Sequence, residues 1–170
     1  MTKKEWVVGI YDDKNDAKAA VTALLKEGIA KRAISVIGRG HEEMIEDFEL
    51  EKENSDIAFW GTQGAFWGAI LGALLGGVFF VVPGFGPIVA AGPITAALAG
   101  MVGGAMTGGA ALGLADALIE WGIGEAEAKR IEKEISQNRL AVVVHGDKEI
   151  VEKAYAILES LGKGEVKIHR

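Results

Sequence analysis

The stretch that decides the fold is WVVGIYDD, residues 6–13, because AVVVHGD, residues 141–147, repeats its pattern near the other end of the chain. In both stretches an apolar, β-branched run reaches aspartate and is followed by apolar residues at helical spacing. The helical pattern stops at Gly28 in the first copy and at Gly162 in the second, 15 residues after Asp13 and Asp147. Each copy therefore predicts a strand, a helix and a glycine stop.

A second short strand follows each predicted helix, at ISVI (residues 34–37) and at VKI (residues 166–168). An offset of 134 residues superposes the two copies, with Ile34 on Ile168. Two such units can pair as a split βαβ, ferredoxin-like sheet in the order 4-1-3-2, with two helices on one face. Neither unit buries enough apolar area alone. The predicted fold class is therefore α+β; the alternative is two independent βαβ pieces that meet partners in an oligomer.

Between the two copies, residues 57–115 carry no charged side chain. This run holds 15 of the 24 glycines and all three prolines. Glycine recurs at every fourth position in two rows, at Gly64, Gly68, Gly72 and Gly76 and then at Gly100, Gly104 and Gly108. So long an apolar stretch must leave water, either in a membrane or inside a large assembly.

The prolines Pro83, Pro87 and Pro93 divide this run. Residues 61–82, as a helix, would be about 33 Å long and match a hydrocarbon core of roughly 30 Å. Residues 93–115 give a second segment of similar length. We expect two transmembrane helices joined by a proline-rich turn. The chain then has three parts: the first βαβ half with an acidic connector (1–56), a glycine-rich helical hairpin (57–121), and a connecting helix with the second βαβ half (122–170).

The ends of the predicted hairpin indicate its orientation. Trp60 precedes the first helix and Trp121 follows the second, as interfacial anchors do. Every lysine and arginine lies on that same side of the hairpin, so we expect both termini and the ferredoxin-like domain in the cytoplasm, attached to the cytoplasmic membrane.

The two glycine rows form a glycine zipper, which lets helix backbones approach closely and favours a homo-oligomer. The rows could also only close the hairpin within one chain. The turn from Pro83 to Gly92 has no polar side chain. It therefore leaves three further alternatives: a re-entrant turn, a hairpin within one leaflet or a lipid store, and a cytoplasmic soluble assembly in which many copies bury it.

Composition excludes several classes of function. The net charge of −6 and the pI near 5.1 argue against nucleic acid, because phosphate binding needs clustered lysine and arginine. The absence of cysteine excludes disulfides and thiolate catalysis.

The titratable residues do not converge on a predicted site. The sheet order places one strand between His145 and His169, about 10 Å apart, with His41 at the far edge. Asp116 and Glu120 are candidate functional acids at the membrane boundary, with a simple helix-end position as the alternative. A cluster of polar residues before the first helix serves to cap that helix rather than to bind calcium; its members are Asp12, Asp13, Asn15 and Asp16. We predict no catalytic residue, metal, cofactor or small-molecule substrate.

The segment VVGIYDD (7–13), its alanine-rich helix, ISVI (34–37) and VPGFGP (82–87) stand in an order that resembles the bacterial general stress proteins, described as heat-induced or low-temperature-induced. The resemblance implies an association with stress and a membrane location, and it carries no catalytic residues. The sequence thus predicts a non-enzymatic, self-associating membrane protein that acts as a scaffold or membrane stabiliser. The alternatives are an oligomeric pore lined by glycine-rich helices and a soluble, self-assembling shell or lipid carrier.

Overall fold

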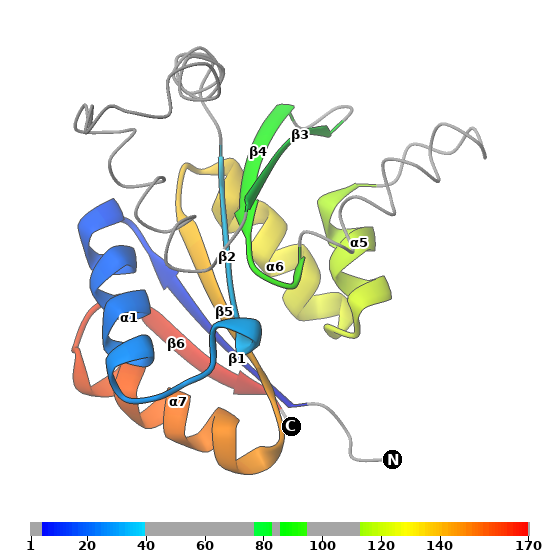
Figure 1. Cartoon of the computed structure of the whole chain (residues 1–170). Coiled ribbons are helices and arrows are strands. Elements are labelled where there is room, and N and C mark those ends of the chain that lie inside the picture. The colour runs from blue at the N-terminus through cyan, green and yellow to red at the C-terminus, as the bar shows by residue number, and fades with distance from the viewer. Residues whose placement is uncertain (1–4, 40–76, 83–85, 95–112, 170) are drawn as a thin grey trace, which may run out of the picture.

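The structure is a computed structural model that describes residues 5–39, 77–82, 86–94 and 113–169 (Figure 1). It is an α+β protein in which helices pack on an antiparallel sheet. In chain order the elements are β1 (Glu5–Tyr11), α1 (Lys14–Lys26), a 3₁₀ turn (Lys31–Ala33), β2 (Ile34–Arg39), β3 (Gly77–Val82), β4 (Gly86–Ala91), α5 (Leu114–Trp121), α6 (Glu125–Ser136), β5 (Leu140–Gly146), α7 (Lys148–Ser160) and β6 (Glu165–His169).

The four strands of the two sequence copies form one sheet in the order β2-β5-β1-β6, and all neighbours are antiparallel. In this register Val8 of β1 lies opposite Val143 on one side and Lys167 on the other. The predicted strand order is therefore confirmed.

Both predicted helices of the repeat begin and end where the sequence indicates. The Asp13 carboxylate accepts a hydrogen bond from the Asn15 amide at 2.6 Å, and the Asp147 carboxylate accepts one from the Ile150 amide at 3.0 Å. After the helices the backbone turns through Gly28 at φ 87° and Gly162 at φ 63°. The capping role predicted for the aspartates before α1 is confirmed at Asp13.

Helices α1 and α7 cover one face of the sheet, as Figure 1 shows. The core between these helices and the sheet combines alternate residues of the central strands with the apolar stripes of the helices. Its larger members are Val7, Tyr11, Val21, Leu24, Ile34, Val142, Val144, Val151 and Leu158.

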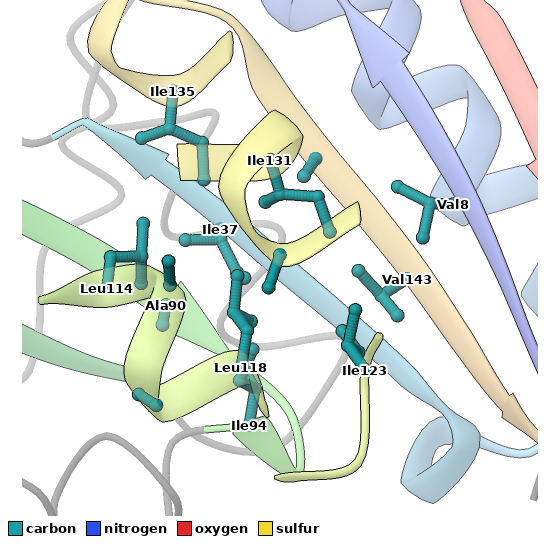
Figure 2. Packing of buried hydrophobic residues seen from close by; sticks show 14 of the residues in the cluster. Val8, Ile37, Ala90, Ile94, Leu114, Leu118, Ile123, Ile131, Ile135 and Val143 are labelled. Carbon is teal, nitrogen blue, oxygen red and sulfur yellow. The ribbon is translucent and has the colours of Figure 1, made fainter. Parts of the chain in front are cut away.

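Helices α5 and α6 cover the opposite face and enclose a second core, drawn in Figure 2. The connecting helix predicted at the start of residues 122–170 is confirmed as α6. Helix α5 corrects the prediction of one helix over 93–115, because a new helix begins after Gly113 and continues to Trp121. The sequence reasoning set its boundary by the first charge, Asp116, whereas apolar residues on both sides of that charge dock on the sheet: Leu114, Ala115, Ala117 and Leu118.

The prediction that residues 61–82 form one helix is wrong over its last six residues. Residues 77–82 form β3, which pairs with β4, and β4 adds to the open edge of β2. Pro87 therefore lies in a strand opposite Val81, and Pro93 follows the end of β4. The physical reason is that GVFFVV combines β-branched and aromatic residues, which suit a strand, and β2 supplies unpaired backbone groups for the hairpin.

The remaining hairpin predictions concern Trp60, Pro83 and the two glycine rows, and they lie outside the described residues. These rows are Gly64, Gly68, Gly72 and Gly76, and Gly100, Gly104 and Gly108. Within the part of the chain that the structure describes, no helix combines the length and apolar character needed to cross a bilayer.

Candidate functional site

The uncharged run joins the folded body at three described points, Gly77, Ile94 and Gly113. Gly77, where β3 begins, lies opposite Ala91, where β4 ends, and Ala91 lies opposite Val36 of β2. We call residues 77–82, 86–94 and 113–121 the insertion base, because they carry all three junctions. All three junctions therefore belong to one sheet and the helix layer packed on it.

The junction after β4 is fixed by a close approach to β2. Gly92 has φ 88°, and a Cβ built there would lie 2.1 Å from the carbonyl oxygen of Ile34, so no larger residue fits without moving the backbone. Two residues later, the buried amide of Ile94 donates a hydrogen bond to Ser35 Oγ at 3.3 Å. Ser35 is fully buried, and this hydrogen bond explains a polar residue in an otherwise apolar strand.

The junction before α5 is fixed by carboxylates. The Gly113 amide donates to Asp116 Oδ2 at 2.9 Å, and the Ala115 amide donates to Glu132 Oε2 of α6 at 2.7 Å. Negative charge at a helix N-terminus satisfies free amides and complements the helix dipole. Asp116, a predicted candidate acid, therefore caps the start of α5, while Glu120 is exposed on the same helix.

Apolar packing adds to these polar contacts. Ile94, Leu114 and Leu118 are each fully buried in the second core, to which β2, β4, β5 and α6 also contribute (Figure 2). Burying one such side chain stabilises the fold by about 1.5–3 kcal/mol. The insertion base therefore contributes to the second core of the folded body through β4, Ile94 and α5.

Aromatic rings pack against one another at the C-terminal end of α5. The Trp121 ring centroid lies 4.5 Å from that of Trp6 and 5.2 Å from that of His145. Trp6 lies opposite His145 on β5 and His169 on β6, so the predicted separation of the two histidines by one strand is confirmed. Trp121, predicted as an interfacial anchor, contacts the body through its ring, and its contact with lipid stays a prediction. Trp60 and His41 lie outside the described residues.

A charged cluster ties α6 to β6. Glu127, whose side chain is 9% exposed, accepts a hydrogen bond from Arg130 at 2.6 Å, and Arg130 also reaches Glu165 at 2.8 Å. His169 Nε2 lies 3.4 Å from Glu127 Oε1. The bond from Arg130 lowers the pKa of Glu165. The carboxylates are thus neutralised by a cation that stays charged, which suits a structural role better than proton transfer.

Two acidic residues around the start of α1 also have partners on the body. Asp12 pairs with Arg139 at 2.6 Å and Asp16 pairs with Lys163 at 2.8 Å. Among the described residues, no three histidine, aspartate or glutamate side chains are grouped so that they could hold a metal ion.

Sequence reasoning missed Ser35, Glu132 and Arg130. A signal existed for Ser35, since it is the one polar residue in the strand ISVI and a buried hydroxyl needs a partner. Glu127 and Arg130 stand three apart on a helix, which indicates a pair but not its burial. Glu132 could not be assigned, because its partner comes from a helix that the sequence reasoning placed elsewhere. Comparisons with known protein families, with curated proteins and with solved structures find no match to this chain.

Proposed function

We propose that this chain is a non-enzymatic, self-associating membrane protein, a scaffold or membrane stabiliser. In this proposal a cytoplasmic, ferredoxin-like α+β body carries two glycine-rich apolar segments, residues 57–76 and 95–112. These segments contact one leaflet of the membrane and the same segments of other copies. One observation carries the proposal: the first segment follows β2 and returns to the folded body at Gly77, and the second leaves it at Ile94 and returns at Gly113.

The first segment lies between β2 and β3. Because β3 is joined through β4 to β2, the chain has returned to the sheet by Gly77. A single crossing of a bilayer would leave β3 and β2 on opposite sides. Two crossings would need about 40 apolar residues, whereas only residues 57–76 precede Gly77 in the uncharged run.

The second segment, residues 95–112, also begins and ends at the folded body. Ile94 is buried against Ser35, and Gly113 begins a helix packed on the same body. Eighteen residues of helix would be about 27 Å long, too short to cross a bilayer and return. The proposal therefore replaces the spanning hairpin expected from the sequence with entry into one leaflet from the cytoplasmic side. The same end points oppose a pore lined by spanning helices.

The glycine rows support self-association. A row of glycines at every fourth position lets helices approach closely in lipid and gain dispersion contacts. Both rows lie wholly within the two segments. The acidic balance of the chain gives no attraction to anionic headgroups, so membrane binding should depend on apolar area and change little with salt.

A soluble, self-assembling shell or lipid carrier is the second candidate. The same end points favour it, because segments that cannot cross a bilayer can bury against one another between bodies. The two candidates differ in where the chain fractionates.

Flotation of a detergent-free lysate in a density gradient separates them. We expect the chain to float with membranes, equally at low and high salt. A large particle that stays at the bottom would select the shell or carrier instead. A monomer that stays at the bottom would contradict both candidates.

Self-association has its own test. The double variant Gly72→Leu and Gly104→Leu should reduce oligomer size, measured by light scattering of protein kept in detergent. The control, Ala73→Leu and Ala105→Leu, places the same leucine side chains one position off each row. Equal sizes for the two variants would refute packing through the rows.

A further inference from the structure

Strand β6 lies at one edge of the sheet that the structure describes. Among the described strands it pairs with β1 alone, so one side of its backbone has no strand partner there. An edge strand presents a row of amide and carbonyl groups that can pair with another chain. Its five residues, EVKIH, alternate polar and apolar side chains.

We propose that β6 pairs with β6 of a second copy of this chain, antiparallel and about a twofold axis at Val166, so that one sheet runs through two bodies. This surface lies on the folded body and involves none of the glycine rows. It is therefore independent of the function proposed above.

Charge decides the register of such a pair. In a twofold antiparallel pair one residue faces its own copy, and its neighbours on each side face each other across the axis. An axis at Glu165 or at Lys167 would place like charges directly opposite, which destabilises a sheet. An axis at Val166 instead places Glu165 of each copy opposite Lys167 of the other, which gives two opposite-charge pairs.

The surroundings of β6 suit this register. The Glu165 side chain is 63% exposed, and its contact with Arg130 holds the carboxylate on the sheet face that α6 covers. Lys167 is exposed on the same face, two residues along the strand. On the other face, a strip of half-buried apolar side chains would gain cover from the second copy: Val166, Ile168, Tyr155 and Leu161.

Disulfide trapping tests the register, because the chain has no cysteine of its own. In Val166→Cys the two thiols face each other across the axis, with Cβ atoms about 4.5–5.5 Å apart, and mild oxidation should give a covalent dimer. In the control Ile168→Cys the two copies are displaced by four residues, about 13 Å, which no disulfide spans. Equal cross-linking of the two variants, or none in either, would overturn the register.

Charge reversal tests whether the partner of β6 is β6 of a second copy. In the Val166→Cys background, Glu165→Lys alone and Lys167→Glu alone each create two like-charge pairs, and each should lower cross-linking roughly tenfold or more. An equimolar mixture of the two variants restores both opposite-charge pairs, so cross-linked heterodimer should recover. Separate tags on the two variants identify it. A mixture that stays as weakly cross-linked as its components would refute pairing of two copies at β6, because a merely structural role of Glu165 predicts no rescue.

Discussion

The junction after β4 gives the sharpest mutational prediction. In Gly92→Ala the new Cβ meets the Ile34 carbonyl oxygen at 2.1 Å and the Ser35 Cα at 2.9 Å, both backbone atoms that cannot rotate away. The positive φ of 88° costs an L-residue about 1–2 kcal/mol, and displacing packed neighbours costs about 1–3 kcal/mol more. Gly92→Ala should therefore lower the free energy of unfolding by about 2–5 kcal/mol.

Gly162→Ala is the matched control. It also introduces a Cβ at positive φ, 63°, but nothing lies within 4 Å of that Cβ. It should cost about 1–2 kcal/mol, from the backbone alone. The melting temperature of Gly92→Ala should then lie roughly 2–12 °C below that of Gly162→Ala.

Hydrogen exchange locates the effect. In Gly92→Ala the amides of residues 88–94 should exchange faster, while those of α7 stay protected. Equal melting temperatures, or unchanged exchange over residues 88–94, would refute the close approach of Gly92 to β2.

Three further predictions concern the body. Leu118→Ala should cost about 2–5 kcal/mol in urea unfolding, because Leu118 is fully buried, whereas Ile119→Ala at the 38% exposed neighbouring position should cost about 1 kcal/mol or less; equal costs would contradict the docking of α5. Arg130→Ala should cost about 3–5 kcal/mol, because it leaves Glu127 buried without its cation, and adding Glu127→Gln should recover most of the loss; no recovery would argue against the charged cluster. Burial, with a smaller contribution from Asp16, raises the pKa of Tyr11 from near 10 to about 12. The unfolded chain therefore loses this proton first as pH rises, and stability should fall by about 2 kcal/mol between pH 10 and 12; Tyr11→Phe should remove that dependence without loss at pH 7, because no partner of the Tyr11 hydroxyl lies among the described residues.

The central sheet could be predicted because its signals are local. Each strand–helix–strand copy carries an aspartate cap, apolar residues at helical spacing and a glycine at positive φ. The constant spacing from Asp13 to Gly28 and from Asp147 to Gly162 identifies the repeat, and pairing two such copies leaves few possible strand orders.

The β3–β4 hairpin could not be predicted in the same way. GVFFVV is apolar at every position after its glycine, so it shows no period that separates a strand from a buried helix. What decides the outcome is the open edge of β2, a partner distant in the sequence. The insertion base was missed for the same reason, because the hydrogen bonds of Ser35 and Glu132 run between elements that the sequence does not show to be neighbours.

The central claim is that both glycine-rich segments begin and end on one side of the membrane. Thiol labelling from the two sides tests it most directly, in a chain whose only cysteine is introduced at Gly84, between β3 and β4, or at Glu149, exposed on α7. With a reagent that cannot cross membranes, both Gly84→Cys and Glu149→Cys should stay unlabelled in intact cells and react once the membrane is opened. Labelling of Gly84→Cys in intact cells, with Glu149→Cys still protected, would place the hairpin on the far side and contradict the account.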